Sequence, residues 1–257
     1  MSGKTIRLRR LFRDGRALIV ALDHGRRHGP IQGIEDLGST LREILPARPD
    51  AVMLTPAMIE RYSDLLADTF IVARVDGTGA VRSTSETDDR LISSVERAVA
   101  AGADAVSVMV YPGSLHEPQL WEKLATVAEE ARSLGIPVMA EVVPKPPVFQ
   151  TFSADIIAYG ARIAAELGAD IVKTLYVEGF EKVTRGVPAP VVILGGARAS
   201  IEEVLKWVER AVRAGAAGAA IGRNIFQHEK PRAVVEALMA IIHRGESAEE
   251  AAGKYLT

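Results

Sequence analysis

The chain has 257 residues, of which 48% are hydrophobic and 25% are charged, and its formal net charge is -2. This ordinary globular composition gives no basic field of the kind that binds nucleic acid. The chain contains no cysteine, which excludes disulfides, cysteine nucleophiles and thiolate metal sites. No apolar run reaches the ~18 residues of a membrane span. We therefore expect a cytoplasmic protein whose partners include neither a membrane nor a nucleic acid.

Residues 1–16 are rich in arginine. The apolar run that follows, Ala17 to Leu22, is too short for the core of a secretion signal. We expect the basic start to form a small helix that covers one end of the domain, with a nucleic-acid-binding arm as the alternative.

Eight short apolar runs alternate with segments of helical spacing along the chain. The runs have the composition of strands buried on both faces. The strands are predicted within 17–22, 51–54, 69–75, 104–110, 136–143, 169–177, 191–194 and 217–221. Helices are predicted over 34–45, 58–66, 89–101, 118–134, 153–167, 179–184, 200–214, 231–243 and 248–255. The polar segment 76–88 is predicted to be an exposed loop.

The junctions between helix and strand repeat. The stretches AAGADAV, ELGADIV and RAGAAGAA each read as a helix end, a glycine cap, a small residue and a strand. Such a rhythm is typical of βα units with a parallel sheet. Eight units in this length predict a (β/α)8 TIM barrel, formed as a single domain over 1–257 with short N-terminal and C-terminal helices. A doubly wound open sheet is the alternative, but no GxGxxG turn follows the first strand.

The active sites of such barrels lie at the C-terminal ends of the strands. Here those ends carry Asp23 and His24 after the first strand, Tyr111 after the fourth, Glu141 on the fifth and Lys173 on the sixth. A lysine is rarely buried without a partner, and burial near other cations lowers an amine's pKa. A neutral amine can attack a carbonyl to form a Schiff base. The alternative is a lysine that ends the strand and reaches solvent.

The last two strand ends carry Gly195 and Gly196, then Gly222 and Arg223. Glycines let backbone N–H groups approach an anion closely, and an arginine fork matches phosphate. Many barrels bind phosphate at this place, so we predict a phosphate site; tight turns alone are the alternative.

Around the lysine, Asp23 could orient the amine or shuttle protons, and His24 could do either. Glu141 either points into the barrel near Lys173 or lies at the rim, and Tyr111 is either a proton donor or a packed rim aromatic. No HxH or HExxH pattern or carboxylate cluster indicates a metal site, and we predict none.

Five segments resemble the DeoC/FbaB family of Schiff-base aldolases. They are ALDHG (21–25), VYPGS (110–114), GADIVKTLYVEGFEKV (168–183), PAPVVILGGAR (188–198) and GRNIFQH (222–228). The family includes archaeal-type class I fructose-bisphosphate aldolases, aminodideoxyheptulosonate synthases and the autoinducer-2 thiolase. The resemblance implies that Lys173 is the Schiff-base lysine with Asp23 beside it. It also implies that Gly195, Gly196, Gly222 and Arg223 hold a substrate phosphate.

One position departs from the family pattern. The aldolases and heptulosonate synthases usually carry an acid/base tyrosine before a Pro-Arg-Gly after strand five, and Val143 stands there. Either Glu141, Tyr111 or His24 moves the proton instead, or the reaction differs. The stretch KTLYVEGFEKV with PVVILGG resembles the thiolase branch more than the aldolase branch.

We therefore expect a metal-independent class I aldolase that acts on a phosphorylated ketose, such as a fructose-bisphosphate-type substrate, through a covalent lysine imine and no other cofactor. One alternative is a thiolase that passes an acetyl group from a phosphorylated dione to coenzyme A as co-substrate. The other is an aminodideoxyheptulosonate-type transaldolase or synthase. The resemblance also implies a homo-oligomer.

Overall fold

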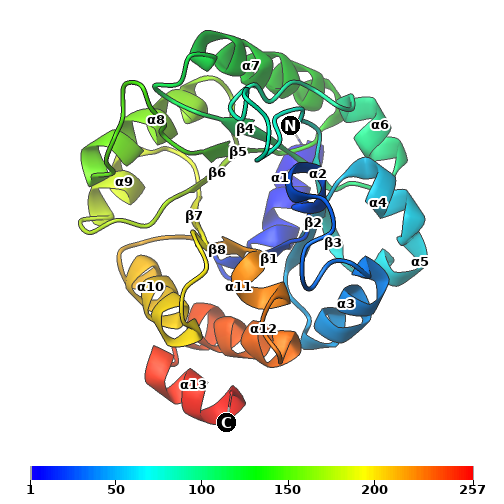
Figure 1. Ribbon diagram of the computed structural model, residues 1–257, viewed down its shortest axis with the longest axis vertical. Coiled ribbons are helices and arrows are strands. Elements are labelled where there is room, and N and C mark those ends of the chain that lie inside the picture. Colours follow the sequence, from blue (N-terminus) through cyan, green and yellow to red (C-terminus); the bar gives the residue numbers. More distant parts are fainter. Residues whose placement is uncertain (1, 257) are drawn as a thin grey trace.

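The structure, a computed structural model, describes residues 2–256. Eight parallel strands pair in chain order, and β8 pairs with β1 to close a barrel (Figure 1). The strands are β1 (Ala17–Ala21), β2 (Ala51–Leu54), β3 (Phe70–Arg74), β4 (Ala105–Val110), β5 (Val138–Val142), β6 (Ile171–Thr174), β7 (Val191–Leu194) and β8 (Gly218–Ile221). The predicted (β/α)8 TIM barrel is confirmed.

Most of the helices form a ring around the barrel, while α1 crosses the middle of the view and α13 stands outside the ring beside α12 (Figure 1). The helices of the first half are α1 (Ser2–Leu11), α2 (Gly25–His28), α3 (Leu37–Ile44), η1 (Leu45–Ala47), α4 (Pro56–Arg61), α5 (Ser63–Leu66), α6 (Val95–Ala100) and α7 (Glu117–Leu134). Those of the second half are α8 (Ala154–Glu166), α9 (Glu181–Gly186), α10 (Ile201–Arg213), α11 (Arg223–Phe226), α12 (Pro231–Met239), η2 (Ala240–Arg244) and α13 (Ala248–Tyr255).

Strand residues alternate between the barrel interior and the helix layer, because successive side chains of a strand point to opposite faces. The interior cluster includes Ile19 of β1, Val72 of β3 and Ile171 of β6. Their neighbours Val20 and Val172 belong instead to the larger core between strands and helices. This parity decides which strand residues can reach a site inside the barrel.

Helix α1 closes the amino end of the barrel. Leu11 is fully buried in the interior cluster, with Leu8 and Phe12 packed against it. The amphipathic start of the chain therefore forms the covering helix that its sequence predicts.

Several element ends follow local chemistry. Helix α7 ends at Gly135, which has the left-handed φ of 67°, as its sequence predicts. The side chain of Ser200 caps α10 in a reciprocal box with Glu203.

Within residues 2–256, no helix has the length and apolar character needed to cross a membrane.

The segment after β3 differs from the prediction. The helix predicted over 89–101 begins only at Val95, where Ser94 provides the N-cap. The segment 76–88, predicted to be an exposed loop, is exposed over residues 81–86, but its first residue Asp76 is fully buried, as is Asp89 just beyond it. Both carboxylates form ion pairs inside the protein.

Candidate active site

A cavity of about 400 Å³ opens at the carboxyl ends of the strands. Seven of the nine predicted site residues line it: Asp23, His24, Tyr111, Glu141, Lys173, Gly196 and Arg223. The other two, Gly195 and Gly222, lie behind its wall in contact with the side chains of Asn224 and His24. The site therefore lies where the barrel fold predicts it.

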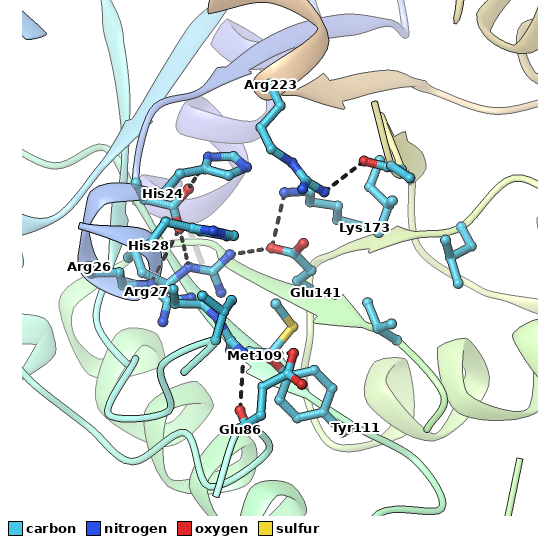
Figure 2. Close-up of a pocket in the computed structure, with 18 of the residues that line it drawn as sticks. His24, Arg26, Arg27, His28, Glu86, Met109, Tyr111, Glu141, Lys173 and Arg223 are labelled. Atoms are coloured by element: carbon cyan, nitrogen blue, oxygen red, sulfur yellow. Dashed lines mark hydrogen bonds and ion pairs between the residues drawn. The ribbon is translucent and has the colours of Figure 1, made fainter. Parts of the chain in front are cut away.

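Lys173 points into the barrel. It has the inward parity of Ile171 on β6, and only 4% of the residue is exposed. In the β5–β6 register Lys173 pairs with Glu141, and its Nζ lies 3.0 Å from Glu141 Oε2. Figure 2 shows the two side chains meeting in the cavity, with the side chain of Arg223 extending toward Lys173. The alternative of a solvent-facing lysine is excluded.

Glu141 receives a second cation at the same oxygen. The guanidinium of Arg74, on β3, donates from Nη2 to Glu141 Oε2. Burial raises the pKa of Glu141, but Lys173 and Arg74 outweigh burial, so the pKa lies below its ordinary value. Glu141 is therefore ionised at neutral pH and lies at the lysine, not at the rim.

Arg74 is a site residue that the sequence analysis missed. Only 1% of it is exposed, and its Nε also donates to Asp23 Oδ2 at 2.9 Å. Arg74 lies in the run TFIVARV, which the sequence predicts to be an apolar strand. An arginine inside an apolar run is the sequence signal that could have identified Arg74, because an unpaired buried charge is too costly to retain.

Asp23, at the end of β1, lines the same cavity as the lysine but has a different hydrogen-bond partner. Its carboxylate binds Arg74, and Arg26 Nε lies 3.6 Å away. Burial raises the pKa of Asp23, but Arg74, Arg26 and the more distant Lys173 lower it well below its usual range. Asp23 thus acts on Lys173 through its charge, and the hydrogen-bonded partner of the amine is Glu141.

His24 is neutral at physiological pH. Burial is the main cause that lowers its pKa to about 4, although Asp23 opposes the shift from 3.7 Å. The ring packs edge-on against Phe226 and fills the space that Gly222 leaves by lacking a side chain. A Cβ on Gly222 would come within 2.3 Å of His24 Cε1. The His24 ring therefore needs a glycine at the end of β8.

Tyr111 is bound within a second polar cluster at the edge of the cavity. Its hydroxyl donates to Asp89 Oδ2 at 3.0 Å and accepts from Arg27. Burial and Asp89 raise the pKa of Tyr111 far above its ordinary value. The phenol therefore keeps its proton and directs it at Asp89.

The β7–β8 side of the cavity is built from backbone. Gly196, at a φ of 67°, presents its carbonyl oxygen to Arg223 Nη2 at 3.0 Å. Asn224, a second residue that sequence reasoning missed, donates to the Gly195 oxygen at 2.8 Å and accepts from Ala199 N at 3.2 Å. Asn224 therefore holds the loop after β7 in the shape that brings Gly196 to the cavity.

The cavity carries an excess of positive charge. Among the described residues its lining includes six fixed cations, namely Arg26, Arg27, Arg74, Lys145, Lys173 and Arg223. It includes three carboxylates, namely Asp23, Glu86 and Glu141. Such a field attracts an anionic ligand.

Val143 also lines the wall and offers no proton-transfer group there. Within residues 2–256, no group of three or more His, Asp or Glu side chains is placed to hold a metal ion.

The family model described as DeoC/LacD family aldolase matches residues 17–228. The chain belongs to this family. The matched range holds all nine predicted site residues, and the resemblance drawn from the five sequence segments is confirmed.

Known relatives support this assignment along nearly the whole chain. The aldolase is 37% identical over 253 residues to a 2-amino-3,7-dideoxy-D-threo-hept-6-ulosonate synthase of Halobacterium salinarum, covering 97% of this chain and 95% of the relative. It is 32% identical to an archaeal fructose 1,6-bisphosphate aldolase of known structure, with a TM-score of 0.87, covering 94% and 100% of the two chains.

A further solved structure bears on the chemistry. It is an archaeal fructose-1,6-bisphosphate aldolase with the catalytic Lys covalently bound to the carbinolamine intermediate of its substrate. Its identity to this chain is 31%, its TM-score is 0.85, and the match covers 93% of this chain and 99% of that one. This aldolase is therefore an enzyme of the class I, Schiff-base type, in which a lysine provides the covalent chemistry.

Proposed function

We propose that Lys173 is the Schiff-base lysine and that the enzyme makes or breaks a C–C bond in a small phosphorylated ketose. The observation that carries the proposal is the buried amine 3.0 Å from the Glu141 carboxylate, inside a cationic cavity at the barrel mouth. An amine in this setting has a proton acceptor in contact and a counter-ion for the iminium that it forms.

The first stage forms the imine. Glu141 takes a proton from the Lys173 ammonium, and the neutral amine attacks the keto carbon of the substrate to give a carbinolamine. The Glu141 carboxyl then returns the proton to the carbinolamine hydroxyl, which leaves as water. The product is a protonated imine whose positive charge lies beside the ionised Glu141.

The second stage breaks the C–C bond. Glu141 accepts the proton of the hydroxyl on the carbon β to the imine carbon. The bond between the α and β carbons breaks, and its electron pair moves into the iminium. An aldehyde leaves and an enamine remains on Lys173. Glu141 thereby replaces the tyrosine that the family usually carries at the position of Val143.

The β7–β8 side of the cavity is our candidate phosphate site. The guanidinium of Arg223 and the backbone at Gly196 line the same cavity as Lys173, and Arg223 donates to the Gly196 oxygen. Binding of the phosphate there would hold the keto carbon near Lys173 Nζ, which makes the attack effectively intramolecular.

A second substrate class is favoured by the 37% identity to the heptulosonate synthase. The product named for that relative is a ketone with a carboxylate. Its keto group would meet Lys173, and its carboxylate would meet the cations of the cavity. We therefore propose a phosphorylated ketose first and a heptulosonate-type product second.

Reductive trapping tests the role of Lys173. Borohydride is added with dihydroxyacetone phosphate, fructose 1,6-bisphosphate or the heptulosonate, and the Lys173 peptide is examined by mass spectrometry. The expected result is a reduced adduct on Lys173 in the wild type and none in Lys173→Arg, which keeps the positive charge beside Glu141. An unlabelled Lys173 with all three compounds would contradict the proposal.

A cleavage assay over the same compounds and a phosphorylated dione, with and without coenzyme A, then selects the reaction. Turnover of a ketose phosphate without coenzyme A supports the aldolase. Product formation that requires coenzyme A would instead assign the thiolase reaction. The homo-oligomer stays a prediction, which light scattering on the purified chain would test.

A further inference from the structure

The cation that joins the two carboxylates of the site does not itself reach the amine. Arg74 lies on β3 and binds Asp23 at the end of β1 and Glu141 on β5. These are alternate strands of the barrel, so one guanidinium connects three strands across the interior. A planar fork with five donors suits this task, because its N–H groups point in fixed and separate directions.

The reaction changes the charge that Glu141 meets. Lys173 and Arg74 both contact its Oε2. When Lys173 becomes a neutral amine or a carbinolamine, one of these two cations is lost. Arg74 stays in contact with Glu141, and its charge favours the ionised carboxylate each time Glu141 gives up a proton, whereas burial favours the neutral form.

Arg74 is itself held from behind. Its Nη1 lies 3.5 Å from Asp76 Oδ1. The other oxygen of Asp76 accepts from Met109 N at 2.6 Å and from Lys123, which extends inward from α7. Lys123 also donates to the Met109 carbonyl at 2.9 Å. Three cations and three carboxylates thus balance in one buried chain: Lys123, Arg74 and Lys173 with Asp76, Asp23 and Glu141.

We propose that Arg74 is a positioning residue of the reaction, which holds Glu141 directed at Lys173 and keeps its carboxylate ionised whenever it does not carry a proton taken from the amine or the substrate, and that Asp76 and Lys123 fix Arg74 for this role. The proposal rests on the proposed function of Lys173. It adds a residue that acts on the reacting nitrogen through Glu141, and it predicts a specific change with pH.

The predicted change follows from the groups that face Glu141. They are Lys173 from β6, Arg74 from β3, Asp23 and His24 from the end of β1, and Tyr111 from the end of β4. His24 and Tyr111 are uncharged at neutral pH, and Asp23 repels a negative Glu141. Removing Arg74 therefore leaves Asp23 opposing the ionised form, so the loss of the Glu141 charge moves to higher pH.

The experiment measures the rate of borohydride-trapped adduct on Lys173 with dihydroxyacetone phosphate from about pH 5.5 to about pH 9.5. Wild type, Arg74→Lys and Arg74→Met are compared with Arg97→Met, whose arginine is paired with Glu60 on the surface. In Arg74→Met the rate at neutral pH is expected to fall at least ~10-fold and to recover as pH rises. Arg74→Lys should lie between the two, and Arg97→Met should match the wild type.

Several outcomes would overturn the proposal. One is a wild-type pH profile in Arg74→Met, and another is an equal loss at every pH, which would indicate a purely structural role. Thermal unfolding of each variant shows whether it folds. If Arg74→Met does not fold, Arg74→Lys and Asp76→Asn provide the test. Both should move the acid limb of the pH profile of the trapping rate to higher pH. Unchanged profiles in both variants would refute the proposal. If the wild type forms no adduct at any pH, the proposed function itself is refuted, and with it the role proposed for Arg74.

Discussion

The two ends of the barrel interior are made by the same strands with opposite chemistry. At the amino end, Phe70 of β3 and Ile171 of β6 pack in an apolar cluster with Leu11 of α1. At the carboxyl end, the inward positions of the same two strands carry Arg74 and Lys173. Two to four residues along a strand are enough to pass from one environment to the other.

Both ends are buried, but burial has different consequences for them. Apolar burial at the amino end stabilises the fold by about 25 cal/mol per Å² removed from water. Burial of charges at the carboxyl end costs free energy unless each charge has a partner. The comparison indicates that the amino end supplies stability and that the carboxyl end uses part of it to hold ions in reactive positions.

Among the substitutions considered, Lys173→Met at the carboxyl end should have the largest effect, which is a loss of activity. Without the amine no imine forms, and we expect activity to fall at least ~10³-fold. Stability should change far less than activity. Turnover and thermal unfolding are measured on the same preparation, and residual activity within ~10-fold of the wild type would contradict the assignment.

Leu11→Ala is the corresponding substitution at the amino end, where it should lower the stability of the fold. Leu11 is fully buried under the barrel, so its truncation leaves a cavity and should lower the free energy of unfolding by about 3 kcal/mol. The turnover number of the folded enzyme should stay unchanged. Urea denaturation gives the stability, and Ile6→Ala on the same helix is the control because Ile6 is 58% exposed. An equal effect of both substitutions would refute the role of α1 as a packed cover.

Gly222→Ala tests the close packing between Gly222, after β8, and the end of β1. The new Cβ would lie 2.5 Å from the Ala21 carbonyl oxygen as well as close to His24. Because backbone cannot move aside easily, we expect about 2 kcal/mol of destabilisation and a loss of activity. Gly186→Ala, where a Cβ meets nothing within 4 Å, should be nearly neutral. A wild-type melting temperature for Gly222→Ala would show that His24 can shift freely.

A polar cluster at the amino end should give the smallest effect. His243 Nδ1 lies 2.7 Å from Asp14 Oδ2, and its Nε2 lies 2.8 Å from Asp50 Oδ2. The hydrogen bond to Asp50, with further help from Asp14, raises the pKa of His243 against the effect of burial. The charged ring therefore stabilises the folded state fully below the ordinary histidine pKa of about 6.5, and this contribution is lost as pH rises through the raised pKa.

Unfolding free energies of the wild type and His243→Gln measure this contribution. The wild type should be more stable by about 1 kcal/mol near pH 6, a modest value because Asp14 is partly exposed. The difference should shrink near pH 9. A difference that grows with pH would reverse the sign of the linkage and contradict the arrangement.

The sequence by itself determined the barrel, the strand that carries the lysine and the residues at most strand ends. Hydrophobic runs and glycine caps are local features, so eight repeated units could be recognised without knowing any contact. The same holds for Lys173, Gly196 and Arg223, because strand ends in a closed parallel barrel must meet at one rim.

Only the tertiary structure decided which charges pair. The partner of Lys173 is Glu141 and that of Asp23 is Arg74, whereas the sequence analysis places Asp23 beside the amine and leaves the position of Glu141 open. The structure also places Asp76 and Asp89 in buried ion pairs, and the helix predicted from residue 89 begins at Val95. Local periodicity tells which face a side chain takes, but ion pairs across β1, β3 and β5 depend on strand tilt and barrel closure, which no local pattern records.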